Sequence, residues 1–202
     1  MIKEKSQLWA LASKKLGEIS SKLPFSPNHY TWMTIPIALI GMGMMIYGWV
    51  WCSTLLFLIA GVCDLIDGAL ARHLNCASSK GAFLDGSLDR FIDSIILFSY
   101  FWLPLELPWL LLGQWIYIAL FFAIMPSFIV AYANHRQAVV DPEEKIIWRI
   151  LNRGEMFFFM LLIPILSLYN THWASALFIV FIGLSILTTL QVLFRTLHLA
   201  EK

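Results

Sequence analysis

Four aspartates recur at helical spacing within a strongly apolar part of the chain. Asp64, Asp67, Asp85 and Asp89 lie in the segment DLIDGALARHLNCASSKGAFLDGSLD. An aspartate near the middle of a membrane costs about 2.5–3.5 kcal/mol on insertion scales, so such residues usually serve a function. If both flanks are helical, the first pair shares a face at i,i+3 and the second at i,i+4. Four convergent oxygen donors predict bound Mg²⁺ or Mn²⁺, and two ions can share them.

Basic residues in and beside this segment allow a second interpretation of the carboxylates. Arg72, Lys80 and Arg90 can neutralise helix-end aspartates as structural ion pairs. Such structural ion pairs are the alternative to a metal site.

The full spacing is D-x2-D-G-x2-A-R-x8-G-x3-D-x3-D, from Asp64 to Asp89. It resembles the motif of the CDP-alcohol phosphotransferase family at all eight fixed positions. The resemblance implies a metal-dependent membrane enzyme that transfers a phosphatidyl-type group from a CDP-activated lipid to an alcohol and releases CMP. It also implies that Asp89 is the general base, in addition to lying close enough to help the other three aspartates bind metal.

The residues between the aspartates suit the approach of a nucleotide or phosphate. Gly68 and Gly81 leave the backbone open, and Ala71 keeps that wall thin. Arg72 lies one turn beyond Gly68, where charge-assisted hydrogen bonds can hold a phosphate oxygen. For Gly81 alone, a glycine at a helix entry is an equally simple explanation.

A second short element, SPNHYT, precedes the first apolar run. It resembles the P-N-x-x-T element of the same family, which implies that Pro27, Asn28 and Thr31 face the nucleotide. The simpler alternative is local capping, because Pro27 suits a helix entry and Asn28 or Thr31 can satisfy free amides there.

The composition is that of a membrane protein, with 13% charged residues among 202 and a mean hydropathy of +0.75. We predict an all-α protein, a bundle of six transmembrane helices over residues 31–202 with a cytoplasmic segment over 1–30. The predicted helices cover residues 31–50, 52–73, 82–104, 108–134, 150–170 and 173–197, and the first predicted break runs from Gly48 to Ser53. Each is close to the roughly 20 residues that cross a membrane. The start of the chain has no uninterrupted apolar stretch typical of a signal peptide.

Residues 3–22 have the pattern of an amphipathic helix that lies on a membrane surface. Five lysines alternate in a rough helical period with Leu8, Trp9, Leu11, Leu16 and Ile19. Lysines at anionic headgroups and a tryptophan at the interface are typical of such helices. A solvated helix without lipid contact is the alternative.

The positive charges predict the orientation of the helices. With both termini cytoplasmic, all 14 Lys and Arg residues fall in or near the cytoplasmic regions, and the opposite loops carry none. The positive-inside rule therefore places the aspartates toward the cytoplasm. Because the basic residues form no single patch, we expect no nucleic-acid partner. Membrane lipids are expected partners.

The identity of the acceptor alcohol depends on the region around residues 135–156. Arg136, Lys145, Arg149 and Arg153 are more cations than a neutral alcohol requires. The alternative is that they only satisfy the positive-inside rule and bind lipid headgroups. The region resembles, more weakly, the subgroup that transfers to inositol phosphate, and it keeps Arg136 and Arg153. It departs from that subgroup at Asn134, Met156 and Val192, where the subgroup has arginine. We therefore expect a phosphorylated polyol, with inositol phosphate ahead of glycerol 3-phosphate and serine third.

Two other functions fit part of the pattern. A divalent-cation channel or transporter would also use intramembrane carboxylates, but it does not need Gly68, Ala71, Arg72 and Gly81 at fixed offsets. A noncatalytic relative that binds CDP-lipid would tolerate loss of Asp89, which is present. The family resemblance further implies a homodimer.

Overall fold

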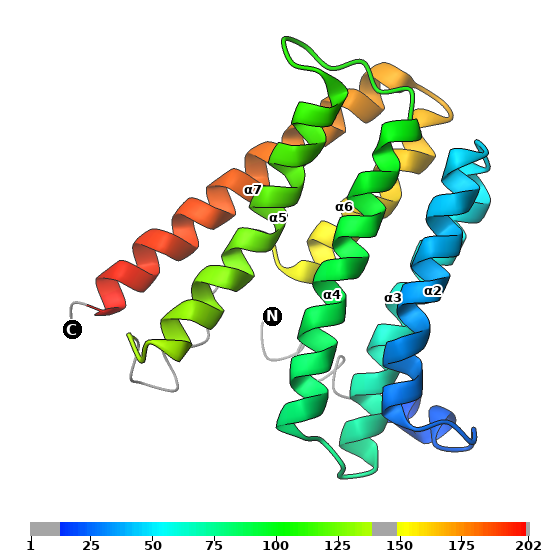
Figure 1. Ribbon diagram of the computed structural model, residues 1–202, viewed down its shortest axis with the longest axis vertical. Helices are drawn as coiled ribbons and strands as arrows, with labels where there is room; N and C mark the ends of the chain where they lie inside the picture. Colours follow the sequence, from blue (N-terminus) through cyan, green and yellow to red (C-terminus); the bar gives the residue numbers. More distant parts are fainter. Residues whose placement is uncertain (1–12, 139–148, 201–202) are drawn as a thin grey trace. The chain divides into compact units, whose positions relative to one another are not determined.

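The computed structural model describes residues 13–138 and 149–200, and the regular elements within those ranges are all helical (Figure 1). The long helices are α2 (Pro27–Ile46), α3 (Val50–His73), α4 (Ser79–Ser99), α5 (Leu112–His135), α6 (Arg153–Ser167) and α7 (Thr171–Ala200). A 3-10 turn, η1 (Tyr100–Trp102), follows α4, and residues 13–20 are also helical. The all-α class is confirmed for these ranges, and each predicted apolar run overlaps one long helix.

Four of the described helices are long and apolar enough to cross a membrane, namely α2, α3, α5 and α7. Helix α6 has 15 residues, fewer than the roughly 20 that span the hydrocarbon core. Helix α4 has 21 residues but carries Asp85, Asp89, Arg90 and Asp93. The membrane class is therefore supported, and the count of six spans stays a prediction.

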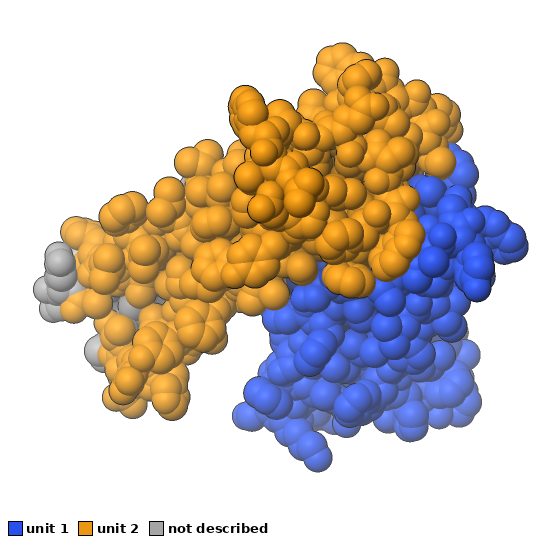
Figure 2. Space-filling view, turned by 45° about the horizontal axis from the view of Figure 1, so that its top comes forward, with its two compact units in different colours: residues 1–96 blue, residues 97–202 orange. Residues whose placement is uncertain are grey.

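The chain divides into two compact units, residues 1–96 and 97–202, which Figure 2 shows in different colours. In the first unit, α2 and α3 form a hairpin with extensive contacts (Figure 1). A β-carbon added at Gly41 would lie 2.8 Å from the ring of Phe57, which is fully buried. The absence of a side chain at Gly41 therefore lets the two helices pack closely.

Helices α2 and α3 end in the same way. Gly48 follows α2 with a φ of 76°, and Asn75 follows α3 with a φ of 52°. In both turns two amides reach back to carbonyls of the last helical turn, as Cys76 N does to Ala71 O at 3.0 Å. This Schellman arrangement requires a left-handed residue, which glycine and asparagine adopt most readily. It explains why the first predicted break falls at Gly48.

The helical segment 13–20 packs against the last turn of α3. A β-carbon at Gly17 would lie 2.7 Å from His73 Cβ and 2.8 Å from Ala69 O. Gly17 and Ser20 are buried, whereas Ile19 is 65% exposed. Small residues therefore form the face that contacts α3. The aromatic and leucine positions Leu8, Trp9 and Leu11 lie outside the described residues, so the interfacial role of this segment stays a prediction.

In the second unit, α7 contacts both α5 and α6. The core includes Phe178 and Phe181 from α7, and Tyr100 OH donates a hydrogen bond to Met160 O at 2.8 Å. Side chains of α7 also fix the residues before α6. Gln191 Oε1 accepts from Ile150 N at 2.9 Å, and Thr188 Oγ1 accepts from Leu151 N at 3.2 Å.

Candidate active site

Three carboxylates of the first unit come together at the end of α3 and the start of α4. One potential ligand oxygen from each of Asp64, Asp67 and Asp85 lies within 4.8 Å of the other two. The predicted pairing across two helices is therefore present for these three residues. Carboxylate oxygens so close to one another repel unless a cation or a proton neutralises them. Hard oxygen donors of this kind suit Mg²⁺ or Mn²⁺.

Asp67 provides the strongest sign that this cluster holds a cation. The residue is 4% exposed, and its Oδ2 atom is buried without a hydrogen-bond partner among the described residues. A buried carboxylate oxygen normally has a partner, since leaving one unsatisfied costs about 1–3 kcal/mol or more. The chemistry of the three residues therefore fits a divalent ion.

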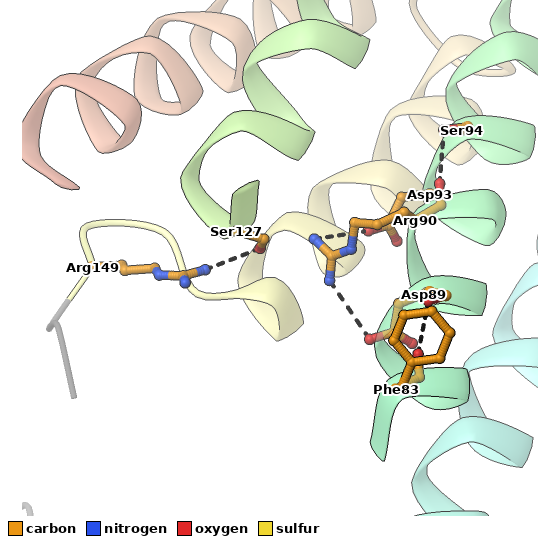
Figure 3. Close-up of polar contacts among 8 residues, drawn as sticks. Phe83, Asp89, Arg90, Asp93, Ser94, Ser127 and Arg149 are labelled. Carbon is orange, nitrogen blue, oxygen red and sulfur yellow. Dashed lines mark hydrogen bonds and ion pairs between the residues drawn. The ribbon is translucent and has the colours of Figure 1, made fainter. Parts of the chain in front are cut away.

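Asp89 lies outside this group of mutually close oxygens, one helical turn beyond Asp85. It is 7% exposed, and its Oδ2 atom lies 3.6 Å from Arg90 Nη2. The Nη1 atom of the same arginine lies 3.8 Å from Asp93 Oδ2, as Figure 3 shows. Arg90 therefore forms ion pairs with both Asp89 and Asp93. Metal binding by Asp89 stays a prediction.

A cavity of about 390 Å³ adjoins the carboxylates. Its walls come from the start of α2, the end of α3, the turn after it and the start of α4. They include six of the eight motif positions, and the two exceptions are Asp64 and Asp89. They also include every predicted position of the SPNHYT element. The lining residues are Ser26, Pro27, Asn28, Thr31, Asp67, Gly68, Ala71, Arg72, Cys76, Ala77, Ser78, Gly81, Ala82 and Asp85. Two sequence elements predicted to face the nucleotide therefore line the same space.

Gly68 and Gly81 have different local roles in this cavity. A β-carbon at Gly68 would lie 3.3 Å from Arg72 Nη1, so the guanidinium folds back over the glycine. Gly81 donates its amide hydrogen to Ser78 Oγ at 3.1 Å, which makes Ser78 a cap for the first turn of α4. Both glycines line the cavity, as their predicted role requires.

The SPNHYT element starts α2 with Ser26 as the N-cap residue and Pro27 in the first turn. The expectation that Asn28 or Thr31 caps free amides is wrong for Thr31, whose hydroxyl donates to Pro27 O at 3.2 Å. His29 reaches back instead, and its Nδ1 atom accepts the Ser26 amide at 3.2 Å. The Thr31 hydroxyl also lies beside the Asp67 carboxylate. This element therefore has a position at the site as well as a role in the helix entry.

Several lining residues carry no motif signal, and sequence reasoning missed them. Ser78 could have been found as a serine three residues before a glycine at a helix start. A smaller cavity of about 190 Å³ is lined by Ser13 and Leu16 together with Asp64, Leu65, Gly68, Arg72 and Asp85. The helical segment 13–20 therefore borders the carboxylate site, which its sequence pattern did not indicate.

The predicted acceptor residues lie in the second unit. Arg136 donates through Nε to Tyr132 OH at 3.1 Å, and its guanidinium lies 5.4 Å from the centre of that ring. Arg153 is the first residue of α6, after an N-cap at Asn152 whose amide donates to Glu155 Oε2. Arg149 donates to Ser127 Oγ at 3.3 Å (Figure 3). Lys145 lies outside the described residues.

Comparison with known proteins gives a consistent set of relatives. A "bifunctional IPC transferase and DIPP synthase" of Aquifex aeolicus is 30% identical over 183 residues, which are 88% of this chain and 39% of that protein. The chain thus spans about two fifths of the length of that relative. An archaetidylinositol phosphate synthase of Pyrococcus horikoshii is 27% identical over 158 residues, 78% of this chain and 77% of that protein.

Solved structures show the same fold. The phosphatidylinositol phosphate synthase of Mycobacterium tuberculosis with CDP-DAG bound has a TM-score of 0.69, covers 93% of this chain and 92% of its own, and is 19% identical. Its complex with manganese and citrate has a TM-score of 0.70 at 18% identity, with 94% and 89% covered.

The motif from Asp64 to Asp89 lies inside a longer region of family similarity. A family model described as CDP-alcohol phosphatidyltransferase matches residues 25–192, from the residue before the N-cap of α2 to the last third of α7. Because that match covers most of the chain, the protein belongs to the CDP-alcohol phosphatidyltransferase family.

Proposed function

We propose that this protein transfers a phosphatidyl-type group from a CDP-activated lipid to a small phosphorylated polyol and releases CMP. One observation carries the proposal. The cavity of about 390 Å³ is lined both by Pro27, Asn28 and Thr31 and by the aspartates and glycines of the long motif. A cavity with carboxylates at one wall and a guanidinium at another fits a metal-bound diphosphate.

The metal-binding part of the site is proposed to consist of Asp64, Asp67 and Asp85, with Asp89 contributing to a second ion. Their oxygens converge within 4.8 Å for the first three, and one Asp67 oxygen is buried without a hydrogen-bond partner in the described structure. Divalent ions, when bound, neutralise the diphosphate and stabilise the departing CMP. The manganese complex of the structurally similar synthase agrees with this choice of ion.

The nucleotide part is proposed to occupy the cavity between the start of α2 and the Gly68–Arg72 turn of α3. Gly68, Ala71 and Gly81 leave room for close approach of the donor to the backbone. Arg72 would hold a phosphate oxygen by a charge-assisted hydrogen bond. The CDP-DAG complex of the solved relative supports a CDP-lipid as the donor.

Asp89 is proposed to act as the base. In the proposed reaction it accepts the proton of the acceptor hydroxyl, whose oxygen then bonds to the phosphorus that carries the lipid group. The bond from that phosphorus to the CMP oxygen breaks, and CMP leaves. A largely dry position, 7% exposed, allows a carboxylate to take this proton efficiently.

The acceptor is proposed to be inositol phosphate, ahead of glycerol 3-phosphate and then serine. Two curated relatives are named as phosphatidylinositol phosphate or archaetidylinositol phosphate synthases. Arg136 and Arg153 are the proposed ligands of the acceptor phosphate. Met156 and Val192 are buried apolar residues, where the inositol phosphate subgroup has arginine. Part of the acceptor pocket must therefore be built differently from that subgroup.

Six membrane spans, a cytoplasmic site, two cytoplasmic termini and a homodimer complete the proposal. The distribution of Lys and Arg supports the orientation. In the first unit, the start of α2, the end of α3 and the start of α4 all contribute to one cavity. These three ends are the ones that the charge rule assigns to the cytoplasm.

Release of CMP by purified protein in detergent or liposomes tests the proposal. The donor is a CDP-diacylglycerol-type lipid, and the acceptors are inositol phosphate, glycerol 3-phosphate, serine and free inositol. We expect turnover with a phosphorylated polyol, and a sharply raised acceptor KM in Arg136→Ala and Arg153→Ala. The exposed Arg195 serves as the control position for loss of one cation. Divalent-ion flux through liposomes without any CDP-lipid turnover would instead support a channel or transporter.

A further inference from the structure

Arg72 is held from two sides, and one of them is the N-terminal helical segment. Its Nη1 atom lies over Gly68, and its Nη2 atom donates a hydrogen bond to Ser13 Oγ at 2.9 Å. Arg72 lines both the larger cavity and the smaller one. Ser13 lines the smaller cavity, so the Ser13–Arg72 contact lies at the wall of that cavity, which Asp64 and Asp85 also line.

The position of Ser13 is set by the close packing of its helix on α3. Gly17 has no side chain, and a β-carbon there would lie 2.7 Å from His73 Cβ. Ser20, on the same helix, is also buried, and its hydroxyl donates to Leu16 O at 2.7 Å. One turn before Gly17, the same helix therefore carries Ser13 to the guanidinium.

An arginine with only one contact would not keep a fixed direction. Arg72 is exposed, and a long side chain in that state samples many rotamers. A side chain binds phosphate more tightly when its hydrogen-bond donors already point toward the phosphate position, because less conformational freedom is lost on binding. The hydrogen bond to Ser13 Oγ restricts this freedom.

We propose that Ser13 is a positioning residue for the donor, acting through Arg72. Its hydroxyl oxygen accepts from Nη2 and leaves the rest of the planar guanidinium aimed at a phosphate of the CDP-lipid. The inference rests on the function proposed above and extends it to a segment that precedes the family match, which begins at residue 25. Ser13 itself touches neither the metal-binding carboxylates nor the reacting atoms in this scheme.

A matched pair of variants separates the hydroxyl from the shape of the side chain. Ser13→Thr keeps a hydroxyl, whereas Ser13→Val lacks one, and valine is nearly isosteric with threonine. Both introduced side chains are β-branched, so their helix propensities are similar. We expect Ser13→Val to raise the donor KM about threefold to tenfold with little change in kcat, and Ser13→Thr to stay near wild type. Acceptor KM should not change in either variant.

A double-mutant cycle tests whether the effect passes through Arg72. In an Arg72→Ala background, Ser13→Val should produce no further rise in donor KM. Ser21→Ala serves as the control, because the exposed hydroxyl of Ser21 donates to the nearby Glu18 O at 2.8 Å. Direct binding of the CDP-lipid, measured by calorimetry, should show the same ranking without turnover.

Equal donor KM values for Ser13→Thr and Ser13→Val would overturn the inference. A further rise of the same size in the Arg72→Ala background would overturn it as well, because the effect would not depend on Arg72. Failure of the wild-type protein to release CMP from any CDP-lipid would instead remove the proposed function, and this inference with it. Wild-type turnover, combined with a donor KM that does not depend on the hydroxyl of residue 13, would remove this inference and leave the proposed function intact.

Discussion

The guanidinium of Arg72 lies over Gly68, with Nη1 at 3.3 Å from the point where a side chain on that glycine would begin. The two residues are one turn apart on α3 and line the same cavity. Gly68 therefore leaves room for the Arg72 side chain as well as for any ligand. Their fixed separation in sequence has a direct spatial reason.

Gly68→Ala should lower the affinity for the donor without unfolding the protein. The new methyl group would push the flexible end of Arg72 aside and narrow the cavity. Alanine in place of glycine favours a helix by about 0.5–1 kcal/mol, so α3 should not be weakened. Donor KM and melting temperature, measured on the same sample, check both parts. A raised melting temperature with an unchanged donor KM would contradict the proposed position of the diphosphate.

Removal of a carboxylate from the three-aspartate group should abolish metal-dependent activity. Asp67→Asn and Asp85→Asn each lose a ligand charge, and the loss of metal assistance corresponds to about 10²–10⁴ in rate. Both variants should still insert and fold, because asparagine is nearly isosteric with aspartate. Manganese titration followed by CMP release measures binding and rate together.

Chelation gives an independent test of the same site. Treatment of the wild-type protein with EDTA should stop turnover, and added Mg²⁺ or Mn²⁺ should restore it. Full turnover in a demonstrably metal-free sample would remove the ion from the proposed reaction.

The Asp89→Asn variant should still bind the CDP-lipid donor but should fail at the chemical step. A general base contributes about 10²–10⁴ to the rate, and it acts only when the acceptor is attacked. We therefore expect a large fall in kcat with a nearly unchanged affinity for the CDP-lipid. Calorimetric binding and single-turnover kinetics distinguish this result from a loss of metal. An equally large fall in donor affinity would assign Asp89 to metal binding alone.

Cys76 is a natural reporter for the orientation and the occupancy of the cavity. It is exposed and lines the cavity in the turn after α3. In a Cys52→Ser, Cys63→Ala background, a membrane-impermeant maleimide should label Cys76 only from the cytoplasmic side. Added CDP should slow the labelling, because the nucleotide would cover the thiol. A cysteine introduced at Asn170 should show the opposite sidedness, and labelling of Cys76 from outside would reverse the proposed topology.

Gly41→Ala should destabilise the hairpin of α2 and α3. The added β-carbon would lie 2.8 Å from the ring of Phe57, whose buried position prevents an easy shift. Such overpacking costs about 1–3 kcal/mol, which exceeds the gain in helix propensity. Gly43→Ala is the matched control, since nothing lies within 4 Å of its β-carbon position. Thermal unfolding in detergent should separate the two variants in opposite directions.

The sequence allows accurate prediction of the parts of the fold that depend on hydropathy. Each of the six long helices falls within or close to a predicted apolar run, and Gly48 marks the first turn as expected. The start of α6 is less well predicted. It begins at Arg153 because Asn152 and Glu155 cap it, three residues later than the apolar run alone indicates.

The carboxylate site is predictable because helical periodicity places Asp64 and Asp67 on one face. The contribution of the N-terminal helical segment to this site is not predictable from the sequence. The amphipathic pattern draws attention to Leu16 and Ile19, yet Gly17 and Ser20 are the buried residues of this helix, and Gly17 is the one that approaches α3. Small residues carry little hydropathy signal, and close helix packing depends on the shape of the partner surface. The Ser13–Arg72 contact, between residues far apart in sequence, follows only from that packing.

In the predicted six-span topology, the charged residues of α4 oppose the insertion of that helix into the membrane during biosynthesis. Each aspartate at mid-membrane depth adds about 2.5–3.5 kcal/mol to the cost of insertion, and pairing with Arg90 offsets only part of it. Substitutions that make α4 more apolar would ease translocon-mediated insertion and raise yield. Among them, changes at Asp85 and Asp89 would remove groups that the proposed chemistry needs. Selection for expression level alone should therefore enrich inactive chains altered in α4.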